Sequence, residues 1–233
     1  MFLDVRGLNV NDDSDKEGRT VLMHAVFRKQ LPIVQSLLNI EGINVNLRND
    51  RGHTALFTIA EHASEDDITV EIAKMLLNVE GIDVNRRDKD GLSPLWVAVR
   101  TNHQRIVETL LSFKGIDVNR RDIWRNTPLV HAAYKGYDLA AKSLLKMEGI
   151  NVNSSNHLGE TALWTAVREN HPSMVKILLD AEDIDANKRT DEGETPLMKA
   201  VSSGHWSIAK SLLEVEGIDV SDIDAHELVR ITR

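Results

Sequence analysis

The chain has 233 residues, of which 42% are apolar and only 4% aromatic, and a formal net charge of −8. It contains no cysteine, which excludes disulfides and cysteine-bearing metal sites. Its acidity disfavours nucleic acid as the general partner, because a nucleic-acid-binding surface is basic. The first ten residues lack the basic and apolar regions of a signal peptide, and no apolar run reaches the roughly 20 residues of a membrane span. We therefore expect a cytoplasmic or nuclear protein that does not enter a membrane.

One pattern recurs along almost the whole chain. Its first half, a Thr or Ser followed two residues later by Leu, starts at positions 20, 54, 93, 127, 161 and 195. Subtraction gives spacings of 34, 39, 34, 34 and 34 residues. Its second half, Gly-Ile-Asp-Val-Asn or a variant of it, starts at positions 7, 42, 81, 115, 149, 183 and 217. A fixed period of roughly 20–50 residues indicates stacked units, each of which contacts only its neighbours.

The copy at residues 93–126 shows why this pattern predicts two helices. Ser93 is a good N-cap because its hydroxyl can accept a backbone N–H, and a Pro fits the first helical position that follows. A short first helix comes next, and an apolar stripe at residues 106–111 predicts a second helix. Gly115 can end that helix in a left-handed conformation. Residues 116–119 alternate in polarity and predict a short extended arm.

This unit resembles the ankyrin repeat, in which Thr-Pro-Leu opens the first of two helices and Leu-Leu closes the second. The resemblance extends from Thr20 to about Val220. It implies an all-α solenoid of stacked helix-turn-helix units joined by β-turn or hairpin loops. We predict a single ankyrin-repeat domain over residues 1–233. Its six repeats span 20–53, 54–92, 93–126, 127–160, 161–194 and 195–220, with a partial repeat or N-terminal cap at 1–19 and a C-terminal cap at 221–233.

Three stretches depart from the regular pattern. Residues 1–19 begin within a repeat, which favours a fragment of a longer protein. The alternative is a natural N-terminal cap whose sequence has become degenerate. The second repeat has five extra residues in the acidic stretch 61–71. They predict either a lengthened binding loop or, preferably, an extended first helix with a solvated linker. Arg125 stands where other hairpins carry Gly, so we expect Asn126 to take the left-handed conformation instead.

Large apolar residues recur at one position of the first helix. They are Met23, Phe57, Trp96, Val130, Trp164 and Met198. We expect them to pack between repeats rather than to bind a ligand. The Leu-Leu pairs of the second helices, such as Leu110 and Leu111, should form the rest of the core.

No motif indicates catalysis, a cofactor or a metal site. Three of the nine histidines share one position just before the second helix: His103, His171 and His205. The resemblance implies a structural role there, in capping and in tying loops together. His226-Glu227 lacks the second histidine of a zinc-protease helix, and Lys142 lacks the preceding Gly of a phosphate loop. We therefore predict no enzyme activity, no cofactor and no bound metal.

In ankyrin-like stacks, partners usually meet a concave face made of hairpin tips and the exposed side of the first helix. Arg and the aromatic residues Tyr and Trp are enriched at binding hot spots. We expect the centre of the site at Arg100, Tyr134, Lys135 and Arg168, with an acidic protein segment as ligand. The alternative for each Arg is a solvated side chain paired with a hairpin Asp. The predicted partner-binding residues are Phe27, Arg28, Arg100, Trp124, Arg125, Tyr134, Lys135 and Arg168.

These patterns favour a non-catalytic recognition or scaffold module that binds a protein partner and is monomeric in isolation. The first alternative is a regulatory or sensor region of a larger protein. It arises because the Gly-Ile-Asp-Val-Asn variant resembles arrays common in large fungal proteins, including signalling NTPases. The second alternative is nucleic-acid binding through basic hairpin tips, which the net charge makes the weaker hypothesis and which a steep salt dependence would support.

Overall fold

The computed structural model describes residues 10–12 and 15–232, and within them it contains thirteen α-helices and an isolated β-bridge between Ser155 and Thr161. The predicted all-α fold is therefore confirmed. The chain divides into two compact units, Met1–Ile116 and Asp117–Arg233. Much of the predicted partial repeat at 1–19 lies outside the described residues.

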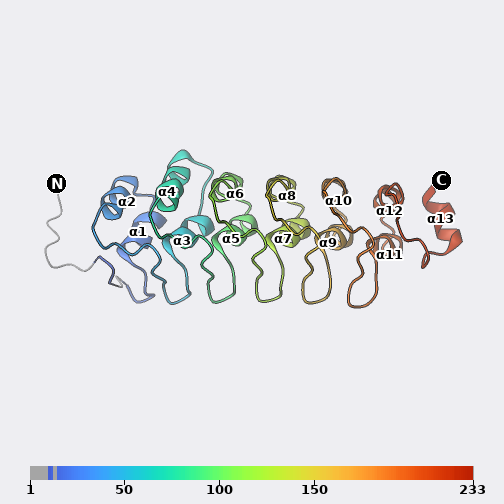
Figure 1. The fold of residues 1–233 in the computed structure, drawn as a ribbon, viewed down its shortest axis with the longest axis horizontal. Coiled ribbons are helices and arrows are strands. Elements are labelled where there is room, and N and C mark those ends of the chain that lie inside the picture. Colours follow the sequence, from blue (N-terminus) through green and yellow to red (C-terminus); the bar gives the residue numbers. More distant parts are fainter. Residues whose placement is uncertain (1–9, 13–14, 233) are drawn as a thin grey trace. The chain divides into compact units, whose positions relative to one another are not determined.

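The first unit contains three helix pairs. The first helices are α1 (Val21–Phe27), α3 (Ala55–Glu61) and α5 (Pro94–Arg100), and the second helices are α2 (Leu31–Leu38), α4 (Asp67–Leu77) and α6 (Gln104–Leu111). Each first helix contacts the next first helix, and each second helix contacts the next second helix. Within this unit, the second helices lie on one side of the first helices and the hairpin loops on the other (Figure 1).

The second unit has the same arrangement with one further helix. Its pairs are α7 (Pro128–Lys135) with α8 (Asp138–Leu145), α9 (Ala162–Arg168) with α10 (Pro172–Leu179), and α11 (Pro196–Ser202) with α12 (Trp206–Leu213). The last helix, α13 (Ala225–Thr232), packs against α12. Asp224 accepts the backbone N–H of His226 at 2.7 Å at the start of this helix, within the predicted C-terminal cap.

The six predicted N-caps are all formed. In each, the hydroxyl accepts the backbone N–H three residues later, with N···O distances of 3.1 to 3.3 Å. These bonds satisfy one of the free donors at each helix start, which is why the first helices begin where the pattern places them. The caps are Thr20, Thr54, Ser93, Thr127, Thr161 and Thr195.

The core is a thin layer of Leu, Ile, Val and Ala between the helix pairs. Leu110 is fully buried and Leu111 is 8% exposed. At the recurring first-helix position, Met23, Phe57, Trp96, Val130 and Trp164 are buried, as predicted, and Met198 is partly exposed. Burial of these side chains between repeats supplies most of the stability of a solenoid, because each repeat alone has too little core.

The Asn that ends six of the seven Gly-Ile-Asp-Val-Asn copies ties one repeat to the next. The Asn119 side chain donates to the carbonyl oxygen of Gly149 at 2.8 Å and accepts the N–H of Asn151 at 2.9 Å. The arm predicted over 116–119 is not a strand: residues 116–117 have no regular structure and residues 118–119 form a turn, in which the Asp117 carboxylate accepts the Asn119 N–H at 3.0 Å. The same side-chain-to-carbonyl bond is made by Asn11, Asn46, Asn85, Asn119, Asn153 and Asn187.

The five extra residues of the second repeat do not lengthen its first helix, which corrects the preferred expectation. Helix α3 ends at Glu61 like its counterparts, whereas the second helix α4 is three residues longer than the other second helices of its unit. The cause is Asp66, whose carboxylate accepts the N–H of Thr69 at 2.7 Å and so starts α4 early. The short linker between α3 and α4 carries the remaining residues.

Arg125 adopts the left-handed conformation itself, with φ 66°, so the expectation that Asn126 would replace it is wrong. The hairpin fixes this position. Asp122 Oδ1 accepts the N–H groups of Trp124 at 2.9 Å and Asn126 at 2.7 Å, and the Asp122 N–H donates to the Asn126 carbonyl. These bonds hold Asn126 opposite Asp122 across the hairpin. The left-handed position of the turn therefore falls on Arg125. A left-handed non-glycine residue costs about 1–2 kcal/mol.

Candidate functional site

Three aromatic side chains of the described residues stand out as exposed. Phe27 is 47% exposed at the end of α1, Trp124 is 55% exposed at a hairpin tip, and Tyr134 is 42% exposed in the last turn of α7. A cation follows each ring directly in the sequence: Arg28, Arg125 and Lys135 respectively. All six belong to the predicted partner-binding set. They lie on hairpins and first helices, which are the elements expected to bind a partner.

The other two predicted residues are engaged by carboxylates. Arg100 Nη2 lies 3.0 Å from Glu61 Oε1 within the first unit. In the second unit, Arg168 lies 2.6 Å from Glu160 Oε1 and 2.8 Å from Glu169 Oε1. Both arginines are paired, but not with the hairpin aspartates considered as their alternative partners. Because a glutamate faces each guanidinium, they offer less uncompensated positive charge to a ligand than their sequence positions suggested.

The remaining cations are less constrained. The Lys135 ammonium lies 4.7 Å from the centre of the Tyr134 ring, where a cation–π contact holds the two together. Arg28 and Arg125 are exposed. A cation beside a partly exposed ring can meet both an apolar side chain and a carboxylate of a ligand.

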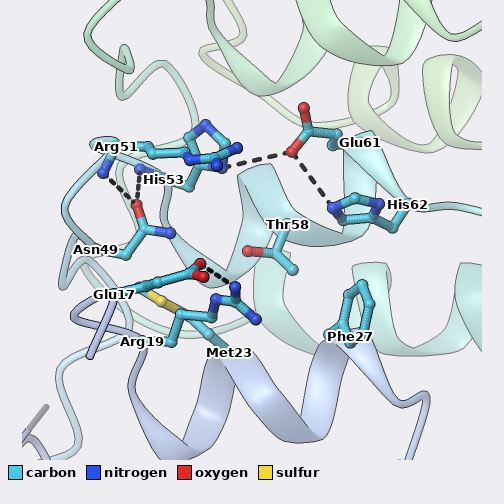
Figure 2. A pocket seen from close by; sticks show the side chains of 10 residues that line it. All are labelled: Glu17, Arg19, Met23, Phe27, Asn49, Arg51, His53, Thr58, Glu61 and His62. Atoms are coloured by element: carbon cyan, nitrogen blue, oxygen red, sulfur yellow. Dashed lines mark hydrogen bonds and ion pairs between the residues drawn. The ribbon is translucent and has the colours of Figure 1, made fainter. Parts of the chain in front are cut away.

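The first unit contains a pocket of about 290 Å³ between the hairpins and the first helices α1 and α3 (Figure 2). The Phe27 ring forms one wall and meets the His62 ring edge-on, with 5.0 Å between centroids. The His53 ring stacks on buried Phe57 at 4.1 Å. The lining residues are Glu17, Arg19, Met23, Phe27, Asn49, Arg51, His53, Thr58, Glu61 and His62.

Glu61 organises the charges of this pocket. Its carboxylate contacts Arg100 at 3.0 Å and lies 3.4 Å from both His53 Nδ1 and His62 Nε2 (Figure 2). Burial lowers the pKa of His53, which favours its neutral form, and burial raises the pKa of the neighbouring Asp88 carboxyl. Arg100, whose guanidinium is always charged, is therefore the permanent cationic partner of Glu61.

The three histidines before the second helices have the predicted loop-tying role. His103 Nδ1 lies 3.2 Å from the carbonyl oxygen of Ala60, and His205 Nδ1 lies 2.9 Å from that of Val167. His171 Nε2 lies 3.3 Å from the carbonyl oxygen of Tyr134. None caps its own helix with its side chain, so the capping part of the prediction is wrong. The rings instead reach back to the first helix of the preceding repeat.

Several hairpin and loop arginines are also paired within the chain. Arg86 contacts Asp83 at 3.5 Å, Arg120 contacts Asp117 at 3.0 Å, and Arg189 Nη2 contacts both Asp219 and Asp222. These exposed pairs contribute little to stability, but they reduce the positive charge available to phosphates. The geometry therefore adds no support to nucleic-acid binding.

Two exposed apolar residues at hairpin tips were missed by the sequence reasoning. Ile123 is 55% exposed beside Trp124, and Leu158 is 49% exposed at the tip of the next hairpin. A signal was available, because the equivalent tip positions of other repeats carry charged pairs such as Lys89-Asp90.

Among residues 10–12 and 15–232, no cluster of three His, Asp or Glu side chains is placed to hold a metal ion. No helix in the same described portion is long and apolar enough to cross a membrane.

The repeat geometry defines a class of protein, and comparison with known proteins identifies the family. A model described as "Ankyrin repeats (3 copies)" matches residues 2–88, 22–122, 62–156 and 129–224. The chain therefore belongs to the ankyrin-repeat family, whose members are generally non-catalytic protein–protein interaction modules.

Solved structures of this family resemble the chain over most of its length. The ankyrin repeat protein EF0377 is 25% identical, with a TM-score of 0.76 over 87% of this chain and 100% of its own. An ankyrin repeat domain (ABAYE2397) from Acinetobacter baumannii AYE is 28% identical, with a TM-score of 0.74 over 82% of this chain and 95% of its own. Comparison with curated proteins gave no match.

Proposed function

We propose that this protein binds a protein partner through its hairpins and first helices. The observation that carries this proposal is the set of three exposed aromatic–cation pairs: Phe27-Arg28, Trp124-Arg125 and Tyr134-Lys135. Every other described Phe, Tyr or Trp is buried or partly buried. Solvating an aromatic ring forgoes the stability its burial would give, so rings left in water on these elements are better explained by a ligand than by folding.

The pairs also indicate the chemistry of the partner. A ring provides apolar contact at low conformational cost, and the adjacent cation can pair with a carboxylate. We therefore propose an acidic protein segment with apolar side chains as the ligand. Arg100 and Arg168 contribute less to this site than the three pairs, because Glu61 and Glu160 face them.

The proposed mechanism is rigid display. Within each unit, stacked repeats fix the positions of the exposed side chains before binding, so little conformational entropy is lost there when a partner docks. The partner's affinity should fall as salt concentration rises, because part of the attraction is between exposed charges.

The test compares capture by the immobilised full chain and by a variant that combines Phe27→Ala, Trp124→Ala and Tyr134→Ala. The wild type should retain one or more proteins from native extract, and the variant should lose them with its melting transition nearly unchanged. The matched control is Ile33→Ala with Leu139→Ala. These residues are 42% and 62% exposed but belong to the second helices α2 and α8.

The control should capture the same proteins as the wild type. Equal capture by the aromatic variant would contradict the proposal. Loss of capture in the control alone would place the binding surface on the second helices instead.

A further inference from the structure

The hairpin tips of the second unit are joined edge to edge. The N–H of His157 donates to the Trp124 carbonyl at 3.1 Å, and the N–H of Asp191 donates to the Leu158 carbonyl at 3.0 Å. The His157 ring adds a second contact to the Trp124 carbonyl, at 3.0 Å. Residues at the three tips therefore lie next to one another in a fixed order, held by backbone bonds that no tip side-chain substitution removes.

These three tips differ in chemistry along that order. The first carries Ile123 and Trp124, each 55% exposed, followed by exposed Arg125. The second carries Leu158, which is 49% exposed. The third carries Asp191 and Glu192, both exposed and without an ion pair among those found in the described residues. The row thus runs from a cation and an aromatic ring, through an apolar side chain, to two carboxylates.

We propose that this tip row, defined as Ile123, Trp124, Arg125, Leu158, Asp191 and Glu192, docks a partner segment of complementary order. That segment has a carboxylate facing Arg125, apolar side chains over Trp124 and Leu158, and a basic group facing Asp191 and Glu192. The proposal rests on the proposed function, since it specifies one surface and one ligand chemistry for the same binding module.

Two further observations favour this occupant. In the first unit, the equivalent tips carry the charged pairs Asp50-Arg51 and Lys89-Asp90, so exposed apolar tips are not required by the hairpin itself. Arg125 holds a left-handed conformation that glycine fills more easily, and such an unfavourable conformation points to a role for its side chain. Opposite charges at the two ends also fix the direction of the docked segment, because a reversed charge order would place like charges together.

The test is selection of phage-displayed random 12-residue peptides on the immobilised full chain. We expect enriched peptides in which an apolar group lies between an acidic and a basic group. The acidic group can be nearer to either end of the peptide. Trp124→Ala with Leu158→Ala should weaken their binding at least about 10-fold, as expected for loss of interface anchors. Asp191→Lys with Glu192→Lys should change the residues selected at that end from basic to acidic, a result that mere unfolding would not produce.

The matched control is Lys89→Ala with Asp90→Ala, which alters a tip of the same geometry in the first unit and should leave binding unchanged. The tip row is overturned if the enriched peptides lack opposite charges at their ends or bind the tip variants as tightly as the wild type. Peptides lost from Phe27→Ala with Tyr134→Ala but kept by the tip variants would support the proposed function alone. Failure to enrich any peptide would count against both the tip row and the proposed function. Self-association of the wild type that Trp124→Ala abolishes would assign the tip row to a second copy of the chain.

Discussion

The side chain of Asn46 bridges two repeats, because its Nδ2 donates to the carbonyl oxygen of Gly81 at 2.8 Å. Its Oδ1 accepts the N–H of Asp83, also at 2.8 Å. A side-chain amide can donate and accept at once in this way, whereas an ionised carboxylate can only accept. Two positions earlier in the same motif, the Asn44 side chain accepts the N–H of Asn46 at 3.0 Å. That position is accordingly Asn in some copies and Asp in others, whereas the bridging position holds Asn at six successive copies.

Asn46→Asp should therefore destabilise the first unit by about 1–2 kcal/mol, because the carboxylate cannot donate and leaves the Gly81 carbonyl without its partner. Asn44→Asp, a few ångströms away in the same motif, should change the free energy of unfolding by less than about 0.5 kcal/mol. Urea denaturation followed by circular dichroism measures both. Equal effects from the two substitutions would contradict the assigned roles.

Burial rather than residue type should decide the cost of truncating a leucine in α8. Leu144 is fully buried and Leu139 is 62% exposed on the same helix. We expect Leu144→Ala to cost about 2–5 kcal/mol and Leu139→Ala less than about 0.5 kcal/mol. Thermal melts of the two variants compare them directly, and a similar loss in both would mean that the inward face of α8 has been misassigned.

Asp66 should make the stability of the first unit depend on acidity. Hydrogen bonds from Ser64 and Thr69, with a further one from Lys29, lower the pKa of its carboxyl. A carboxyl whose folded pKa is depressed stabilises the fold above its unfolded pKa of about 3.9, and this contribution is lost as pH falls through the folded pKa. Asp66→Ala should cost about 1 kcal/mol at pH 7, as for loss of an N-cap, and the difference from wild type should shrink below about pH 4.

Asp67→Ala is the control for this comparison. Asp67 is adjacent but its side chain is 95% exposed, and its contact with Arg105 at 2.7 Å is a surface ion pair. Its removal should change stability by no more than about 1 kcal/mol. A difference between wild type and Asp66→Ala that stays constant from pH 7 to pH 2 would rule out the ionised cap.

Arg125→Gly should stabilise the second unit. Relief of the left-handed strain, about 1–2 kcal/mol, exceeds the roughly 0.5–1 kcal/mol of chain entropy that glycine adds to the unfolded state. The net gain should be about 0.5–1 kcal/mol, measured by urea denaturation. The reverse change at the next hairpin, Gly159→Ala, should destabilise by more than about 1 kcal/mol, because its Cβ would lie 2.5 Å from the Asp191 nitrogen. A loss of stability in Arg125→Gly would show that the arginine side chain offsets its own strain.

Local signals predicted most of the fold. Thr20 and its five counterparts set the helix starts because a capping bond involves atoms only three residues apart. The misassigned helix of the second repeat shows the limit of this reasoning. Asp66 was counted as part of an acidic stretch, and its capping role depends on the conformation of the short linker before α4. The conformation of Arg125 was wrong for a related reason, since hydrogen bonds across the whole hairpin outweigh the preference of one residue.

Surface charge could be predicted less well than the helices. Positions of exposed side chains followed from the repeat, so Phe27, Trp124 and Tyr134 were placed correctly on the surface. Whether a cation there is compensated depends on the neighbouring repeat. Glu61 and Arg100 occupy equivalent places 39 residues apart, and aligning the repeats side by side would have revealed their contact. The pairing of Arg168 with Glu160 joins a helix to its own hairpin and has no such signal.

The asparagine bridges also bear on how such a chain can change over evolutionary time. Because the Asn119 and Asn153 boundaries use the same two hydrogen bonds, a duplicated copy of residues 127–160 would find a matching donor and acceptor on both sides. Duplication or deletion of this repeat would therefore preserve the bridging bonds. Evolution could therefore change the spacing between hairpin tips in steps of one repeat without first disrupting the fold. The length of partner segment that the surface can bind would change with that spacing.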